Sequence, residues 1–212
     1  MTSKLSSFPH LSTPEFESAC TSLLHSFNQH SHLQHDWISA ELIHQHESKY
    51  LRITRPLPSP STTAVSEVPE MEEENDDEAL QAPFPTAQAV VQYDILLSPT
   101  YRVPALYVSI KDTLHRYPPT MDTLYRHIIP PVFQSQTKDV GVLGGITITD
   151  HPITNSPEFF VHPCQTAAVM EASAAGRDVT AEEYLLLWIG SLGKCVGLNV
   201  PIELVIREKG KG

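Results

Sequence analysis

The sequence has few cysteines, few basic residues and no long apolar run. Its three cysteines are Cys20, Cys164 and Cys195, and an odd number without tight spacing excludes a disulfide framework and a cysteine-rich zinc site. The 14 Lys and Arg residues are outnumbered by 25 Asp and Glu residues, so a nucleic-acid-binding surface is not expected. No segment reaches the ~20 apolar residues that span a bilayer, and the first residues lack the apolar run of a signal peptide. We therefore expect a soluble, cytoplasmic protein in a reducing compartment.

The negative charge is concentrated in one proline-rich segment. The net charge is −11, and eight acidic residues with no basic one lie between Glu67 and Glu78, so the remainder is close to neutral. Six of the 18 prolines fall between Pro56 and Pro85. Such a segment cannot bury enough apolar surface to offset the entropy lost on ordering. We predict one domain over residues 1–212, in which 56–88 is a disordered acidic insertion that could steer a basic partner surface.

Hydrophobic periodicity in the remainder predicts an α+β domain. Apolar residues recur at helical spacing over 14–30, and again over 180–196 after the capping box formed by Thr180 and Glu183. Cys195 lies on the apolar face of the second of these helices and is interpreted as a core residue. Alternating segments predict strands at 49–54, 90–97, 101–110, 144–149 and 159–161, and further helices are predicted at 121–127 and 166–170. This order indicates helices packed on one antiparallel sheet of about four strands.

The strands 90–97 and 101–110 form a predicted hairpin around a Ser-Pro-Thr turn. Pro104 is expected at an edge or a bulge, because proline cannot donate to a strand ladder. The hairpin could therefore offer an edge to a strand of a partner protein, with Tyr101 and Tyr107 as contacts. Alternate aromatic residues in a strand are, however, more often packing residues.

The tripeptide His162-Pro163-Cys164 follows the apolar strand 159–161 and precedes helix formers that begin at Thr166. A helix N-terminus offers unpaired N–H groups and partial positive charge, which favour a thiolate over a thiol. Cys164 is therefore a candidate nucleophile. From the residues alone, a structural cysteine fits this position as well.

Three blocks of sequence resemble the autophagy E2-like conjugating enzymes. They are Tyr93–Tyr107 (YDILLSPTYRVPALY), the pair His151-Pro152, and Phe159–Thr166 (FFVHPCQT). With the closing helix they cover roughly half of the chain. The resemblance implies a ubiquitin-conjugating (E2-like) fold and an enzyme that accepts a ubiquitin-like modifier as a thioester on Cys164. It implies transfer to an amine, without a metal ion or an organic cofactor.

Two branches of this family share the His-Pro-Cys motif. One transfers its modifier to a membrane lipid, and the other joins autophagy-related protein twelve to a lysine of autophagy-related protein five. The Ser-Pro-Thr-Tyr-Arg-Val-Pro turn resembles the second branch, and the charged C-terminal residues 207–212 differ from the apolar tail of the first. For the second branch, the resemblance implies autophagy-related protein seven as the E1-like activating enzyme, and recruitment to the site of autophagosome assembly.

The groups that assist Cys164 are less well defined. His162 could tune the thiolate or relay a proton, but it could also hold the loop. His151-Pro152 resembles the His-Pro-Asn motif of ordinary E2 enzymes, in which the asparagine stabilises the oxyanion, but Ile153 occupies the third place here. Asn155 could substitute for that asparagine, although loop asparagines usually serve turns.

Three other interpretations stay open at this stage. A non-catalytic E2-like adaptor would bind the modifier without a thioester, and a cysteine hydrolase would pair Cys164 with His151 or His162. A metal site is suggested by the histidines at positions 30, 32, 35, 44 and 46. Their spacing matches no recognised zinc pattern, so a solvated polar stretch between the first helix and the first strand is favoured.

Overall fold

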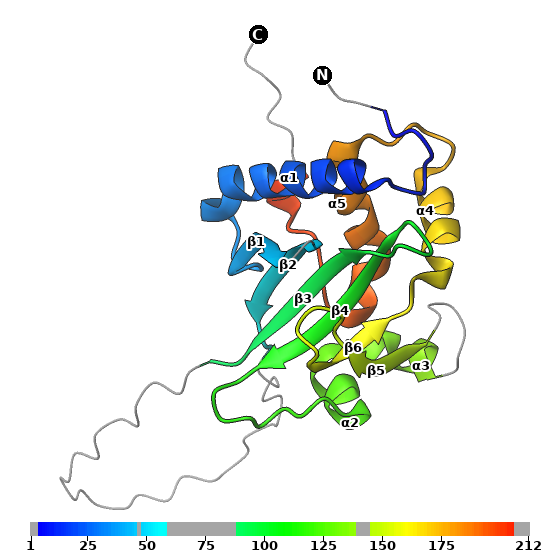
Figure 1. Ribbon diagram of the computed structural model, residues 1–212. Helices are drawn as coiled ribbons and strands as arrows, with labels where there is room; N and C mark the ends of the chain where they lie inside the picture. The colour runs from blue at the N-terminus through cyan, green and yellow to red at the C-terminus, as the bar shows by residue number, and fades with distance from the viewer. Residues whose placement is uncertain (1–3, 46–47, 59–87, 139–144, 206–212) are drawn as a thin grey trace, which may run out of the picture.

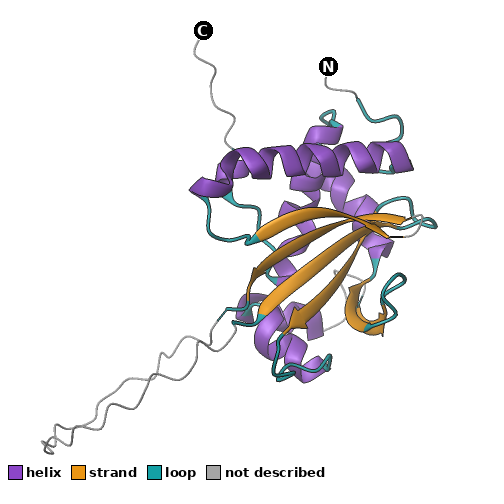
Figure 2. Ribbon diagram, turned by 60° about the vertical axis from the view of Figure 1, so that its left-hand side comes forward, coloured by secondary structure: helices purple, strands orange, loops and turns teal. Residues whose placement is uncertain are grey.

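The fold is built on one antiparallel sheet, which Figures 1 and 2 show from two sides. The computed structural model describes residues 4–45, 48–58, 88–138 and 145–205. Within these residues, six strands follow one another across the sheet in the order β1-β2-β3-β4-β6-β5. Their bounds are β1 Ser39–Gln45, β2 Ser48–Pro56, β3 Val90–Leu97, β4 Pro104–Lys111, β5 Ile146–Asp150 and β6 Pro157–Val161.

Two long helices, α1 and α5, pack against each other; in Figure 1, α1 runs across the top and α5 runs downward behind the sheet. Both begin with a capping box, made by Ser12 with Glu15 in α1 and by Thr180 with Glu183 in α5. Each box satisfies backbone N–H groups that the first helical turn leaves without partners. The helices are α1 Thr13–His30, α2 Met121–Thr123 with a π-helical continuation Leu124–Ile128, α3 Pro131–Lys138, α4 Thr166–Ala174 and α5 Ala181–Leu192.

The core lies between the sheet and these helices. Alternate strand residues point toward it, such as Ile53, Ile95 and Val108, all of them fully buried. The predicted apolar face of the 180–196 segment is buried along its whole length, Cys195 included. Each such aliphatic side chain contributes ~1.5–3 kcal/mol through its removal from water. The predicted class, α+β with helices on an antiparallel sheet, is confirmed.

The predicted count of about four strands was too low. Residues 39–45, assigned to a solvated polar stretch, form β1, and the helix α3 was not predicted. The strand expected from residue 101 begins at Pro104, because residues 98–103 form a turn in which Arg102 is left-handed, with a φ of 54°. Pro104 fits there as the first residue of the strand.

The predicted free edge at the 90–110 hairpin was wrong. β3 pairs with β2 and β4, and β4 pairs with β3 and β6. The edges of the sheet belong to β1 and β5 instead. A partner strand therefore cannot pair along β3, and Tyr107 is a packing residue between His151 and Phe160.

Most of the predicted acidic insertion, residues 59–87, lies outside the described residues. Its two ends are ordered and adjacent, since Pro56 pairs with Val90 and the Leu57 N–H donates to the Ala89 carbonyl at 3.0 Å. Leu57 and Ala89 are both buried. The insertion therefore leaves the sheet between two neighbouring strands.

Candidate active site

Cys164 lies just beyond the end of β6, in a 3₁₀ turn over Pro163–Gln165 that leads into α4. Its side chain is exposed, whereas Cys20 and Cys195 are buried. Burial raises the pKa of the Cys20 thiol to about 12 and that of the Cys195 thiol to about 11. Cys164 is thus the one cysteine of the chain that solvent and a partner protein can reach.

His162 is tied to Cys164 through the backbone. The Cys164 N–H donates to His162 Nδ1 at 3.2 Å, so the imidazole caps the turn. An accepting Nδ1 carries no proton, and the neutral ring then carries its proton on Nε2. The sequence suggested that His162 either tunes the thiolate or holds the loop, and this hydrogen bond is of the second kind. It also leaves the neutral His162 ring with one N–H donor, Nε2–H.

Tyr101 completes the surroundings of His162. The 98–103 turn between β3 and β4 brings the Tyr101 ring edge-on to the imidazole, with centroids 5.3 Å apart, and Phe160 meets it from β6 at 5.8 Å. Tyr101 is 40% exposed, so part of this residue is in contact with solvent. The sequence suggested Tyr101 only as a partner contact, because nothing in its local pattern indicates that the turn folds next to residue 162.

Asn155 lies in a different place. It occupies the β5–β6 turn, which precedes β6, whereas Cys164 follows that strand. Its φ of 54° is left-handed, and its N–H donates to the His151 carbonyl at 2.9 Å. These features are those of a turn residue. In the described part of the chain, hydrogen bonds and ring contacts connect His162 and Tyr101, but not Asn155, to the cysteine segment.

His151 belongs to a group of polar and charged residues on the sheet face opposite to α5, in which Asp94, His151 and Glu158 are buried and Lys111 is exposed. We call this the polar cluster; its members are Arg52, Asp94, Lys111, His151 and Glu158. Arg52 donates to both Asp94 oxygens at 2.7 and 2.6 Å, and Lys111 lies 3.5 Å from Glu158 Oε1. Burial raises the pKa of Glu158, which Lys111 partly opposes. The cations Arg52 and Lys111 thus balance the carboxylates Asp94 and Glu158.

The hydrogen bonds of His151 fix its protonation. Nδ1 accepts from the N–H groups of Ile153 and Thr154, both at 3.2 Å, so the proton is on Nε2, which faces Asp94 Oδ2 at 3.4 Å. Burial lowers the pKa of His151, and the Asp94 carboxylate only partly offsets this effect. His151 is therefore a neutral residue that fixes the start of the β5–β6 turn.

Asp94, His151 and Glu158 have the composition of a metal site, with their ligand atoms all within 4.8 Å of one another. A metal ion requires an unprotonated imidazole nitrogen. His151 offers none, because Nδ1 is occupied by two backbone donors and Nε2 carries the proton. Arg52 also occupies both oxygens of Asp94. The geometry of the polar cluster therefore opposes metal binding.

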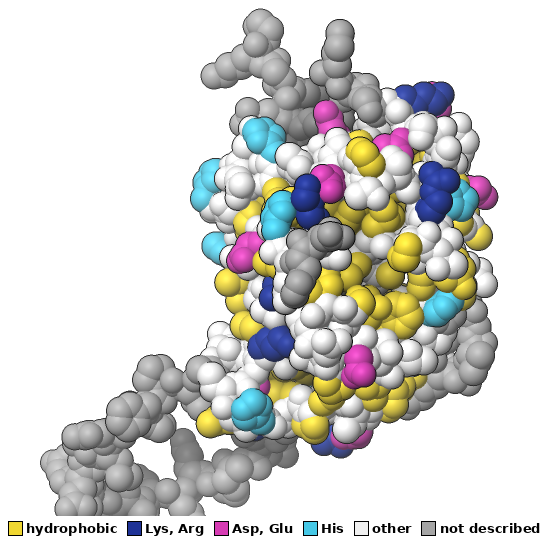
Figure 3. Space-filling view, viewed as in Figure 1, with side chains coloured by type: hydrophobic (Ala, Val, Ile, Leu, Met, Phe, Trp, Pro, Cys, Tyr) yellow, Lys and Arg dark blue, Asp and Glu magenta, His cyan; other side chains and the backbone are white. Residues whose placement is uncertain are grey.

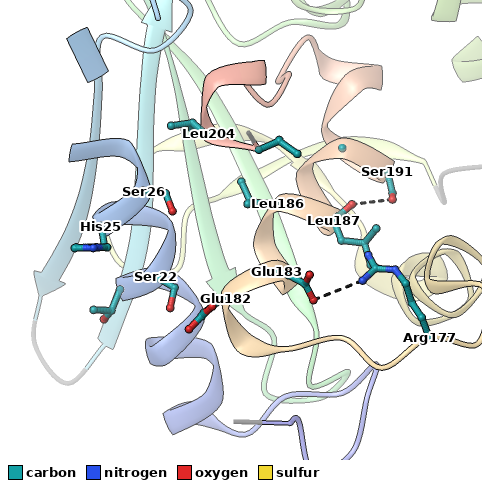
Figure 4. Close-up of a pocket in the computed structure, with 13 residues that line it drawn as sticks. Ser22, His25, Ser26, Arg177, Glu182, Glu183, Leu186, Leu187, Ser191 and Leu204 are labelled. Atoms are coloured by element: carbon teal, nitrogen blue, oxygen red, sulfur yellow. Dashed lines mark hydrogen bonds and ion pairs between the residues drawn. The ribbon is translucent and has the colours of Figure 1, made fainter. Parts of the chain in front are cut away.

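A groove between α1, α5 and the turn Ile202–Leu204 lies apart from Cys164 (Figure 4). It has a volume of about 810 Å³ and is lined by polar residues of α1, such as Ser22, and by Leu186 and Leu187 of α5. An ion pair at 3.5 Å joins Arg177 to Glu183 at its rim. None of the residues around Cys164 lines this groove.

On the face of the molecule that Figure 3 shows, the Lys and Arg side chains are scattered, and several lie next to Asp or Glu side chains. Among the described residues on that face, no large cluster of Lys and Arg is visible. Within the same residues, no helix combines the length and the apolar character needed to cross a membrane.

Comparison with known proteins gives one family and several relatives. The model of the family described as "Autophagocytosis associated protein, active-site domain" matches residues 15–203. The ubiquitin-like-conjugating enzyme ATG10 of Gibberella zeae is 38% identical over 120 residues, which are 56% of this chain and 49% of that protein. The human ATG10 is 28% identical over 121 residues, 53% of this chain and 50% of that protein. The matches thus span about half the length of these curated relatives.

Among solved structures, one described as "Crystal structure of Autophagic E2, Atg10" matches 87% of this chain and 97% of its own. The identity is 14% and the TM-score is 0.41.

Proposed function

Because the chain belongs to the family of autophagocytosis-associated proteins defined by their active-site domain, we propose that it is an E2-like conjugating enzyme of autophagy. It carries a ubiquitin-like modifier as a thioester on Cys164 and transfers it to a lysine of an acceptor protein. The resemblance drawn from three sequence blocks is confirmed at the level of the family. The observation that carries the proposal is the position of the only exposed cysteine, in a His-Pro-Cys turn at the end of the sheet.

The proposed reaction has two steps. In the first, the Cys164 thiolate attacks the thioester carbonyl that links the modifier to its activating enzyme, and the thiolate of that enzyme leaves. In the second, a neutral lysine amine attacks the new thioester, the Cys164 thiolate leaves, and the amine loses one proton as the isopeptide bond forms. Both steps pass through a tetrahedral oxyanion, so hydrogen-bond donors at that oxygen accelerate both.

His162 is the proposed oxyanion donor. Its Nδ1 is committed to the Cys164 N–H, which leaves Nε2–H as a donor on a ring that Tyr101 and Phe160 hold in place. Tyr101, 40% exposed and edge-on to the imidazole, places a phenol ring next to this donor. Asn155 was predicted for this task, but its place in the β5–β6 turn gives that role no support.

The proposed partners follow from the branch of the family that the sequence resembles. They are autophagy-related protein seven as activating enzyme, protein twelve as modifier and protein five as acceptor. The relatives named ATG10 support this branch over the lipid-conjugating one. We place the protein in the cytoplasm, with recruitment to sites of autophagosome assembly.

The hydrolase alternative finds little support in the geometry. A cysteine hydrolase needs a histidine that takes the thiol proton. His151 is fully buried in the polar cluster. In His162, the nitrogen that could take a proton, Nδ1, already accepts a hydrogen bond from the Cys164 N–H. The non-catalytic adaptor differs from the enzyme only in whether the thioester forms.

One experiment separates these possibilities. The protein is incubated with activating enzyme, modifier and ATP, and analysed on a non-reducing gel. The proposal predicts an adduct that thiols remove, that Cys164→Ala abolishes and that Cys164→Ser converts into a stable oxyester. An unmodified protein would support the adaptor, and cleavage of the modifier would support the hydrolase.

A further inference from the structure

The segment before α1 runs from the N-terminal end of α5 to the 98–103 turn, which carries Tyr101. We call residues 4–12 the N-terminal strap. Its first residue forms a strand-like bridge with Thr180, and the Lys4 ammonium lies 2.9 Å from Asp178. Leu5 and Leu11 are buried, at 5% and 0% exposure. In Figure 1 the strap, dark blue, runs from the connection that precedes α5 toward the green turn between β3 and β4.

Tyr184 of α5 fixes the middle of the strap. Its hydroxyl donates to the Pro9 carbonyl at 2.7 Å, and its ring meets Phe8 edge-on with centroids 6.1 Å apart. The side chain of Tyr184 is completely buried. The strap is thus held by a hydrogen bond inside the protein, where the loss of one partner leaves the other unsatisfied.

The end of the strap holds the turn that carries Tyr101. The Leu11 N–H donates to the Arg102 carbonyl at 2.7 Å, and the Arg102 N–H donates to the Ser98 carbonyl at 2.8 Å. Arg102 is left-handed, with a φ of 54°. A residue with a Cβ atom keeps this conformation only when its surroundings hold it there. The strap supplies one of the two backbone hydrogen bonds that do so.

We propose that the N-terminal strap is a positioning element of the active site and that Tyr184 is its anchoring residue. Contacts run from Tyr184 through Pro9 and Leu11 to the 98–103 turn, and from Tyr101 in that turn to His162. The strap therefore sets the position of Tyr101 against His162 at Cys164. Tyr184 acts through these residues and touches no reacting atom. The inference rests on the proposed function, because the site that is positioned is the thioester site.

The chain offers a matched control for the test. Tyr93 is also a buried tyrosine, 1% exposed, and its hydroxyl donates to the Val196 carbonyl at 2.9 Å. Tyr184→Phe and Tyr93→Phe therefore remove the same group from the same kind of bond, but only the first loosens the strap. Each full-length variant is loaded with modifier, and discharge of the thioester to lysine is followed in a single turnover.

We expect Tyr184→Phe to slow discharge between about threefold and about tenfold, since small displacements in a site reduce its rate strongly. Tyr93→Phe should discharge like the wild type even though both variants unfold at a lower temperature. In a Tyr101→Ala background, Tyr184→Phe should have no further effect, because both changes act on the same contact. Equal discharge rates for the two phenylalanine variants would overturn the proposal.

A second variant and a second readout address folding and function separately. Phe8→Ala loosens the strap from its own side and should slow discharge as Tyr184→Phe does; a wild-type rate would contradict the proposal. Hydrogen exchange at the Leu11 amide should accelerate in Tyr184→Phe and not in Tyr93→Phe, and unchanged exchange would also overturn it. A wild-type protein that forms no thioester is a different result, which overturns the proposed function itself.

Discussion

The hydrogen bond between the Cys164 N–H and His162 Nδ1 decides what this imidazole can do. A histidine two residues before a nucleophile suggests a base, but a base needs a free nitrogen lone pair. With Nδ1 occupied, the neutral ring offers only Nε2–H, so His162 is suited to stabilise negative charge on the substrate oxygen. We propose that this role replaces that of the asparagine in the His-Pro-Asn motif of ordinary E2 enzymes, where this chain has Ile153.

Substitutions of His162 test this assignment. His162→Ala removes both the acceptor for the Cys164 N–H and the donor, and should lower the single-turnover discharge rate by about 10²-fold. His162→Asn offers a carbonyl oxygen and an amide N–H, so it should retain much of the activity that alanine loses. If the asparagine variant is as slow as the alanine variant, donation by residue 162 is not what the site requires.

Among the helices and strands, local sequence signals were sufficient for some and not for others. α1 and α5 were predicted closely, because each has a continuous apolar face and the sequence of α5 also shows its capping box. The exposure of Cys164 also followed from its junction between strand and helix. In contrast, β1 is a mixed polar strand with little alternation, and it is held in the sheet by its pairing with β2.

Two features of the site depend on contacts between distant residues and could not be predicted. Tyr101 meets His162 only because β4 and β6 pair near their ends, and Leu11 reaches Arg102 from the other end of the chain. The polar cluster likewise collects residues from β2, β3, β4, β6 and the β5–β6 turn. A sequence without an alignment shows such residues singly, and their pairing appears only in the fold.

The N-terminal cap of α1 gives a prediction on pH. Burial alone would raise the pKa of Glu15, but hydrogen bonds from Ser12 and Ser6 outweigh it and lower the pKa from 4.5 to about 2. The bonded carboxylate therefore stabilises the fold above pH 4.5, and this contribution is lost as the pH falls toward 2. The free energies of unfolding of the wild type and Glu15→Gln, measured in urea, should converge over that range. A constant difference would show that the charge of Glu15 is irrelevant.

The sheet gives a prediction on buried charge. Arg52→Ala leaves Asp94 without its bidentate partner at 1% side-chain exposure, and should destabilise the protein by about 3–5 kcal/mol. Arg126→Ala is the control, since Arg126 and its partner Asp122 are 67% and 73% exposed, and it should cost less than about 1 kcal/mol. Denaturant unfolding measures both. Similar losses in the two variants would mean that the polar cluster is not a buried ion-pair network.

At the scale of the whole molecule, the sheet brings together the two ends of the acidic insertion. Deletion of residues 66–80 should leave the melting temperature within experimental error, because Leu57 and Ala89 remain paired and loop closure depends only weakly on length. The same variant tests electrostatic steering by the insertion. Unchanged transfer at low and at moderate salt would reject steering, whereas a large drop in melting temperature would show that the insertion supports the fold.

The fold exposes one thiol of three: Cys20 in α1 and Cys195 in the turn after α5 are buried, whereas Cys164 stands exposed just beyond the end of β6. The most direct measurement is intact-protein mass spectrometry after incubation with activating enzyme, modifier and ATP, followed by peptide mapping without reductant. We predict an increase equal to the modifier minus one water, located on Cys164 and removed by added thiol. No adduct, or an adduct on another residue, would contradict the assignment of Cys164 as the thioester carrier.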